Sequence, residues 1–158
     1  MKSIIITGGG AGIGKACAET FAEAGWRVAV IGRRPEPLEA LADRYDGVLA
    51  LPCDVTDRAA LNAAVDRAVD HFGGLDAVFA HAGKGVSSPG IEQGVPAEWD
   101  EMIQLNVIAV LSTAHATLPH LRKTKGHFVV TGSKAGRDHL KGSVYGATKW
   151  FVHGLAGN

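Results

Sequence analysis

Residues 3–14 read Ser-Ile-Ile-Ile-Thr-Gly-Gly-Gly-Ala-Gly-Ile-Gly, and this stretch indicates how the chain begins to fold. Residues 4–6 are apolar and β-branched, as a buried parallel strand requires. Glycines follow, and helical periodicity then runs from about residue 12 to a stop at Gly25. A strand, a glycine turn and a helix form the setting of a phosphate-binding loop, because glycines admit a phosphate to the backbone and the helix start offers free N–H donors.

The spacing of these glycines separates two kinds of phosphate loop. The common dinucleotide pattern G-x-G-x-x-G is not met, because its last place falls on Ile13; the pattern present is G-x-x-x-G-x-G, from Gly8 to Gly14. Residues 9–15 also match the G-x-x-x-x-G-K pattern of nucleotide triphosphatases. That motif needs a Ser or Thr next to hold magnesium, and the chain has Ala16, so a nucleotide hydrolase ranks far behind.

Strand-like and helix-like segments alternate along the rest of the chain. This alternation predicts an α/β fold with a doubly wound parallel sheet, Rossmann-like, in a single domain over residues 1–158. Ligands bind such sheets at the carboxyl ends of the strands. The expected strands lie near 3–7, 26–32, 48–53, 75–80 and 127–132, and the expected helices near 12–24, 36–45, 57–72, 97–122 and 143–156.

Composition excludes several classes of protein. The chain of 158 residues is 46% hydrophobic with zero formal net charge, which favours neither disorder nor nucleic-acid binding. Cys17 and Cys53 fit small core positions, and the histidines show no metal-ligand spacing. The first strand begins almost at Met1, which leaves no room for a signal peptide, and no apolar run approaches membrane-spanning length. We therefore expect a cytoplasmic protein that binds neither metal nor membrane.

Three polar residues near the end of the chain indicate proton-transfer chemistry. Tyr145 and Lys149 share one helical face, so the ammonium would lie beside the phenol and favour its ionised form. Ser133 lies twelve residues before Tyr145, just after an apolar run. A Tyr–Lys pair at this spacing also occurs by chance on surface helices. A serine esterase is excluded, because its nucleophile needs glycines two places before and after, where Thr131 and Ala135 stand.

Taken in order, these pieces resemble the short-chain dehydrogenase/reductase family over essentially the whole chain. The resemblance rests on Thr7-Gly8-x-x-x-Gly12-x-Gly14, Asp54-Val55, Ala82-Gly83, Asn106, Ser133 and Tyr145-x-x-x-Lys149. It implies an oxidoreductase that moves a hydride between a nicotinamide cofactor and a carbonyl or secondary alcohol. Tyr145 would be the general acid/base, Ser133 would bind the substrate oxygen, Lys149 would tune the tyrosine and bind the ribose, and Asn106 would complete a proton relay.

The resemblance also implies where the dinucleotide lies. Asp54 would bind the adenine amino group beside the Val55 backbone, although Asp54 also fits a turn ahead of a helix cap at Thr56. The residues expected to contact the cofactor are Thr7, Gly8, Gly10, Gly12, Ile13, Gly14, Arg33, Arg34, Asp54, Val55, Ala82, Gly83, Tyr145 and Lys149.

The sequence favours NADP(H) over NAD(H). An NAD site would place a carboxylate near the end of the second strand, where the chain has Gly32 followed by Arg33 and Arg34. Guanidinium groups bind phosphate in bidentate fashion, so a 2′-phosphate fits there, more firmly at Arg33 than at Arg34. The alternative is that both arginines are solvated loop charges.

The chain departs from the family pattern in two places. His81 replaces the asparagine usual before Ala82-Gly83, and the chain stops after the last expected helix, where family members continue with two more strands. The strand at 127–132 would then be a bare apolar edge. We expect a fragment of a longer enzyme, against two alternatives: strands supplied by a partner or swapped subunit, or a naturally short, non-catalytic form.

Substrate and assembly can be predicted only coarsely. Residues 84–94 and 134–142 would form part of the substrate wall, and Lys134, Arg137, His139 and Lys141 fit either a polar or anionic substrate or a solvated loop. The family resemblance implies a homodimer or homotetramer packed through the helices near 97–122 and 143–156. The second functional hypothesis is therefore an NADP-binding or dimer-forming module without turnover.

Overall fold

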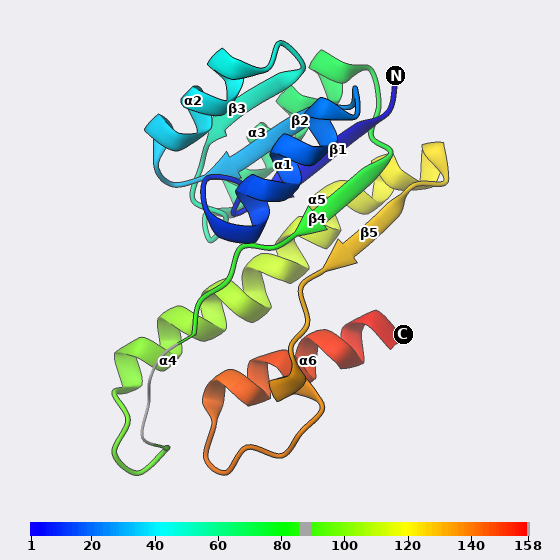
Figure 1. Ribbon diagram of the computed structural model, residues 1–158. Coiled ribbons are helices and arrows are strands. Elements are labelled where there is room, and N and C mark those ends of the chain that lie inside the picture. Colours follow the sequence, from blue (N-terminus) through cyan, green and yellow to red (C-terminus); the bar gives the residue numbers. More distant parts are fainter. Residues whose placement is uncertain (86–89, 158) are drawn as a thin grey trace.

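The computed structural model describes residues 1–85 and 90–157 and contains one five-stranded parallel sheet (Figure 1). The strand order is β3-β2-β1-β4-β5, so the chain winds outward from β1 first in one direction and then in the other. The doubly wound α/β fold expected from the sequence is confirmed. The strands are β1 (Ser3–Thr7), β2 (Arg27–Gly32), β3 (Val48–Pro52), β4 (Ala77–Ala80) and β5 (His127–Val130).

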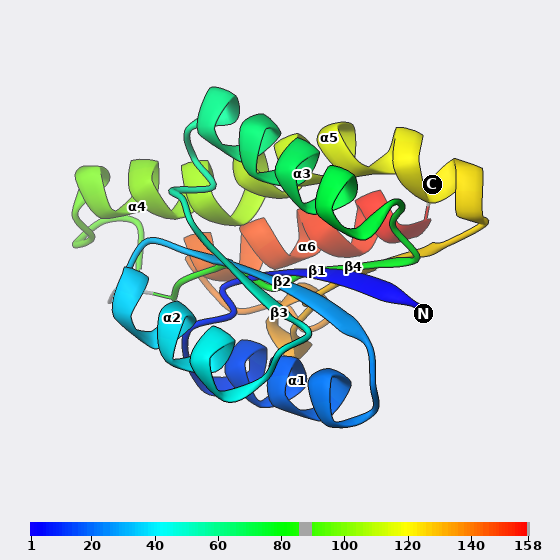
Figure 2. The same ribbon diagram turned by 90° about the horizontal axis from the view of Figure 1, so that it is seen from above.

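Helices cover both faces of the sheet, as Figure 2 shows from above. Helices α1 and α2 lie on one face, and α3, α5 and α6 lie on the other. Because side chains alternate along β1, Ile4 and Ile6 pack into the first layer and Ile5 into the second. The helices are α1 (Gly12–Glu23), α2 (Pro35–Arg44), α3 (Arg58–Phe72), α4 (Pro96–Ile103), α5 (Ala109–Thr124) and α6 (Val144–Gly157).

The helix expected near 97–122 is continuous but not uniform. A π-helical turn, η1 (Gln104–Ile108), joins α4 to α5 and carries Asn106 at its centre. The extra residue in this turn changes the direction in which side chains point, and such π-turns often mark functional sites. A 3₁₀ turn, η2 (Lys134–Gly136), follows β5 and was not expected.

No apolar run of membrane-spanning length was expected from the sequence, but the combined helical stretch Pro96–Thr124 is 29 residues long. An 18-residue window of it has a mean hydropathy of 1.2, so the helix is long and apolar enough to cross a membrane by length and composition alone. The helix packs against α3 and the sheet, and 39% of that window is buried inside the protein. The core helix of a soluble protein passes the same test, so this stretch is weak support for a membrane span.

Strand β5 forms one edge of the described sheet, next to β4. Its residues are only partly covered, and Val129 is 52% exposed. The apolar edge expected from the sequence is therefore present in the part of the chain that the structure describes. After β5 the chain passes through η2 to α6, which packs against η1 and α4.

The turn after β1 depends on two glycines. Gly8 adopts φ of 72°, a left-handed conformation that glycine tolerates best. Gly14, in the first turn of α1, lies so close to this turn that a Cβ would overlap the carbonyl oxygen of Gly8. The absence of side chains thus lets the start of α1 lie directly against the end of β1.

We predict that Gly14→Ala destabilises the protein by about 1–3 kcal/mol, because overpacking of a tight contact typically costs that much. The free energy of unfolding in urea measures the effect. Lys15→Ala, at the exposed neighbouring position on α1, is the matched control and should change stability by less than about 0.5 kcal/mol. Equal stability of the two variants would contradict the close approach of Gly14 to Gly8.

Candidate active site and nucleotide cavity

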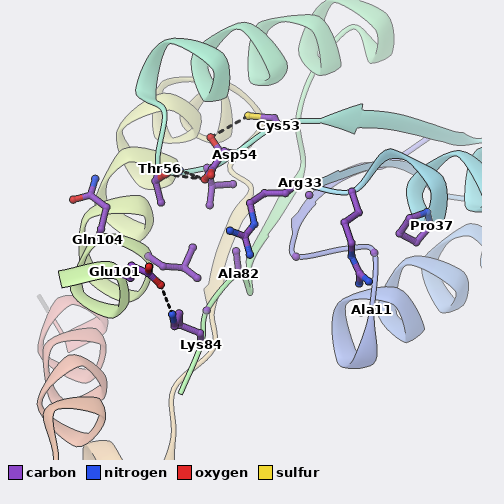
Figure 3. A pocket seen from close by; sticks show the side chains of 17 residues that line it. Ala11, Arg33, Pro37, Cys53, Asp54, Thr56, Ala82, Lys84, Glu101 and Gln104 are labelled. Atoms are coloured by element: carbon purple, nitrogen blue, oxygen red, sulfur yellow. Dashed lines mark hydrogen bonds and ion pairs between the residues drawn. The ribbon is translucent and has the colours of Figure 1, made fainter. Parts of the chain in front are cut away.

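A cavity of about 850 Å³ opens at the carboxyl ends of β1, β2, β3 and β4 (Figure 3). Chain segments that are far apart in the sequence meet there. Its lining includes eight of the residues expected to contact a cofactor: Gly8, Gly10, Arg33, Arg34, Asp54, Val55, Ala82 and Gly83. The volume suits a small-molecule ligand of nucleotide size.

The start of α1 fits an anionic ligand. Its N-cap is Ala11, which lines the cavity and provides no side-chain cap, and the first turn of α1 carries no acidic residue. The free N–H groups of the first turn and the positive end of the helix dipole are therefore available to a phosphate. Ile13, in the same turn, is 62% exposed. Gly12 has φ of 52° and does not line the cavity, and neither do Ile13 and Gly14.

The two arginines and Asp54 lie on the side of the cavity formed by β2 and β3. Figure 3 shows the Arg33 side chain extending into the cavity near Asp54 and Ala82. The Asp54 carboxylate accepts hydrogen bonds from the Thr56 backbone N–H (2.9 Å) and hydroxyl (2.8 Å). The backbone bond first, and also the hydroxyl and the Arg33 charge, lower the pKa of Asp54. Its carboxylate is therefore suited to accept hydrogen bonds from a ligand.

The prediction that Thr56 caps the helix was wrong by one residue, because the cap of α3 is Asp57. Asp57 caps α3, with Oδ1 accepting hydrogen bonds from the backbone N–H groups of Ala59 (2.9 Å) and Ala60 (3.0 Å). Thr56 instead donates to Asp54, so both residues belong to one turn at the edge of the cavity. Turn and cap residues have the same composition, which is why the sequence did not separate them.

Asn106 clamps the backbone that follows β4. The Lys84 N–H donates to its Oδ1 (2.9 Å), and its Nδ2 donates to the Lys84 carbonyl (2.8 Å) and to the Thr148 hydroxyl (3.1 Å). The side chain is 1% exposed, so all three bonds lie largely away from water. Asn106 therefore joins three separate parts of the chain: the loop after β4, the π-turn η1 and helix α6.

Tyr145 and Lys149 lie together on α6, beside the loop after β4. The Lys149 ammonium is 5.9 Å from the centre of the Tyr145 ring. Its Nζ also donates a hydrogen bond to the Thr131 carbonyl (2.8 Å), just after β5. Lys149 is only 7% exposed, and burial lowers the pKa of its ammonium. The helical spacing thus brings a largely buried cation next to a phenol.

Ser133 lies at the start of η2, three residues after the end of β5. Its hydroxyl oxygen accepts a hydrogen bond from the Ala135 N–H (3.1 Å), while its carbonyl contacts Nε2 of His153 (3.1 Å). Ser133, Tyr145, Lys149 and Asn106 all lie outside the lining of the large cavity. Asn106 nevertheless contacts the cavity wall through its two hydrogen bonds with the Lys84 backbone.

Some residues at the site were assigned a different role or no role from the sequence. Thr7, expected to contact a cofactor, is 2% exposed, and its hydroxyl accepts hydrogen bonds from the N–H groups of His81 and Ala82 (both 3.1 Å). Lys84 and Glu101 both line the cavity and form an ion pair of 2.6 Å with each other (Figure 3). No motif marks Glu101, because only the fold brings α4 to the loop after β4.

A second cavity of about 420 Å³ lies between the segment after η2 and helix α6. His139 and Lys141 line it with Trp150, whose ring stacks on that of His139 at 5.2 Å. Lys134 and Arg137 do not line it; Lys134 forms an ion pair with Asp138 (3.5 Å). The other expected substrate wall, 84–94, includes residues 86–89, which lie outside the described residues.

Comparisons with known proteins identify the family and agree with the fold. The family model described as short chain dehydrogenase matches residues 2–158. An uncharacterised oxidoreductase of Staphylococcus aureus is 38% identical over 156 residues; the match covers 96% of this chain and 67% of that protein. The chain therefore spans about two thirds of the length of this curated relative.

Two solved structures share the fold closely. An alcohol dehydrogenase of the archaeon Thermococcus sibiricus, complexed with 5-hydroxy-NADP, has a TM-score of 0.93 and 30% identity, covering 98% of this chain and 68% of its own. A short-chain dehydrogenase/reductase of Burkholderia phymatum, in complex with NAD, has a TM-score of 0.92 and 26% identity, covering 99% and 58%. Relatives of this fold thus occur with either form of the dinucleotide.

We predict that Asn106→Ala lowers the free energy of unfolding by about 2–4 kcal/mol, because the N–H and carbonyl of Lys84 lose their partner at a partly buried position. Urea unfolding measures the loss, and hydrogen exchange of the Lys84 amide should accelerate. Gln104→Ala, at an exposed position of the same π-turn, is the control and should change stability by less than about 0.5 kcal/mol. An unchanged Lys84 exchange rate would argue against the clamp.

Proposed function

The chain belongs to the short-chain dehydrogenase family, and from that premise we propose that it is an NADP(H)-dependent oxidoreductase of carbonyl or secondary alcohol substrates. Tyr145 is the general acid/base of the reaction. The observation that carries this proposal is the largely buried Lys149 ammonium, 5.9 Å from the Tyr145 ring centre, on a helix that Asn106 joins to the wall of the cavity.

The catalytic roles follow from the chemistry of each side chain. Tyr145 donates a proton to the substrate oxygen during reduction and removes it during oxidation. Lys149 stabilises negative charge on the phenol oxygen and binds the nicotinamide ribose. Ser133 donates a hydrogen bond to the substrate oxygen. Asn106 holds the loop after β4 against α6 and completes the route by which a proton reaches solvent.

The nucleotide occupies the cavity of about 850 Å³. Gly8, Gly10 and the uncapped start of α1 receive the diphosphate, with Thr7, Gly12, Ile13 and Gly14 shaping the same turn. Asp54 and Val55 bind the adenine, and Ala82 and Gly83 form the opposite wall. When bound, the nicotinamide supplies the hydride, while the protein positions and polarises the reacting groups.

Arg33 and Arg34 support the choice of NADP(H). Both side chains are exposed at the cavity and no carboxylate takes the place of Gly32, so a 2′-phosphate meets positive charge there. A guanidinium binds phosphate in bidentate fashion, and the single ribose hydroxyl of NAD offers no such contact. Arg33, which also acts electrostatically on Asp54 and Glu101, is the stronger candidate.

The alternative function is an NADP-binding or dimer-forming module without turnover. One observation favours it: large apolar side chains are exposed along α4, α5 and α6. These helices would pack subunits together in a homodimer or homotetramer. The exposed residues there are Ile103, Leu111, Leu118 and Trp150.

Tyr145→Phe should separate the two functions. The variant keeps the aromatic ring and removes the proton donor, so NADPH oxidation with a panel of ketones should fall by at least about 100-fold, while NADPH binding followed by fluorescence stays within about two-fold. Phe151→Tyr, elsewhere on α6, is a control that should leave the turnover unchanged. Binding without turnover in the unmodified chain, with no effect of Tyr145→Phe, would favour the module.

Arg33→Ala should weaken NADPH binding about 10- to 100-fold, because a charge-assisted bond to phosphate contributes about 1.5–3 kcal/mol. Affinity for NADH, which lacks the 2′-phosphate, should change little. Fluorescence titrations at one fixed salt concentration compare the two nucleotides. Arg44→Ala, which removes an exposed arginine paired with Glu19 on α1 (3.4 Å), is the control. Equal weakening of NADPH and NADH would count against Arg33 as the selecting residue.

A further inference from the structure

His81 lies at the end of β4, where three parts of the molecule meet. Its ring stacks on Phe79, with 5.0 Å between centroids and 30° between planes. Its backbone N–H donates to the Thr7 hydroxyl (3.1 Å), which ties it to the end of β1. On the other side, Cδ2 of the ring lies 3.0 Å from the place that a Cβ on Gly14 would take. The ring is therefore held between the glycine turn and β5.

Thr131 connects this ring to Lys149. Nδ1 of His81 and the Thr131 hydroxyl oxygen are 2.8 Å apart, at hydrogen-bond distance. The N–H of Thr131 donates to the Ala80 carbonyl (3.2 Å), so both its backbone and its side chain are anchored to β4. The carbonyl of the same residue accepts the hydrogen bond from Lys149 Nζ (2.8 Å). Thr131 thus contacts His81 through its side chain and Lys149 through its carbonyl.

We propose that His81 is a positioning residue for Lys149: by holding the Thr131 side chain, it fixes the orientation of the carbonyl that binds the ammonium. This inference rests on the role given to Lys149 in the proposed function. His81 stands where the family resemblance leads one to expect asparagine, and the stacking of its imidazole on Phe79 restricts the orientation of the ring. The ring does not contact substrate or cofactor in this role.

The charge of His81 supports the same arrangement. Burial first, and then the charge of Lys149, lower the pKa of His81, so the imidazole is uncharged at and above neutral pH. A neutral ring can hold the Thr131 hydroxyl in either tautomer, as donor or as acceptor at Nδ1. An uncharged His81 exerts no charge repulsion on Lys149, so any effect that it then has on Lys149 passes through Thr131.

The titratable groups whose interactions with Lys149 the structure shows are few. His81 acts on it from the end of β4, and Tyr145 places its ring beside it on α6. The carbonyl of Thr131 faces it from the chain after β5. A carbonyl acceptor favours the ammonium form, while burial opposes it. Loosening Thr131 with burial unchanged should therefore lower the pKa of Lys149 further.

Competitive acetylation of the full 158-residue chain tests the proposal. Acetic anhydride is applied in trace amount between pH 7 and 11, and mass spectrometry of the peptides gives the titration of each lysine. His81→Phe keeps a ring against Phe79 but removes Nδ1, and Thr131→Val removes the hydroxyl but keeps the carbonyl. We expect each to lower the pKa of Lys149 by about half a pH unit.

Three further measurements make the result decisive. The double variant should show no larger change than either single variant, because both act through one bond. Thr131→Ser keeps the hydroxyl, so Lys149 should titrate in this variant as it does in the unmodified chain. Lys134, on the surface after β5, should show the same acetylation profile in every variant. Circular dichroism and thermal unfolding identify the folded variants; if His81→Phe does not fold, Thr131→Val and Thr131→Ser decide alone.

An unchanged or raised pKa of Lys149 in folded Thr131→Val, or additive changes in the double variant, would overturn the proposal. The measurement needs neither nucleotide nor turnover. A chain that fails to bind NADPH or to oxidise it would count against the proposed function, and the lysine titration would still report whether His81 positions Lys149.

Discussion

The contact between Gly14 and Gly8 is the constraint on which the site depends. It places the start of α1 directly at the end of β1, with no side chain between the two backbones. The buried Thr7 hydroxyl then joins this turn to the chain after β4, through the N–H groups of His81 and Ala82. Because β1 is the central strand, these contacts fix the positions of the glycine turn and the adjoining wall of the cavity together.

A second polar centre positions α6. Asn106 provides three hydrogen bonds from the π-turn η1, and the bond to Thr148 reaches the residue next to Lys149. Burying an amide is costly unless its donors and acceptor are satisfied, and all three of these bonds are made. The same residue thus holds the wall of the nucleotide cavity and the helix that carries Tyr145 and Lys149, which keeps the two halves of the site in register.

The burial of a charged side chain at position 149 costs the fold stability. Lys149 is nearly buried although burial disfavours its charge, and His81 is held beside it with a lowered pKa. A hydrophobic residue at position 149 would avoid that cost. A buried cation next to a phenol fits the proposed chemical role of this pair better than a packing role.

The sequence alone determined the fold class and the order of the elements. Three local patterns carried this prediction: the glycine spacing after residues 4–6, the alternation of strand and helix, and the Tyr145–Lys149 spacing. Local patterns can be recognised directly in the sequence. Even there the boundaries shifted slightly: β4 begins at Ala77, not near 75, and the cap of α3 is Asp57.

Only the tertiary structure decided which side chains meet across the sheet. No sequence spacing relates His81 to Thr131, or Lys84 to Glu101, because each pair is joined by the parallel packing of β4 with β5 or by the approach of α4 to the loop after β4. Hydrogen bonds and burial depend on distances between segments that are remote along the chain. Those distances follow from packing, which depends on the sequence but cannot be deduced from the spacing of residues along it.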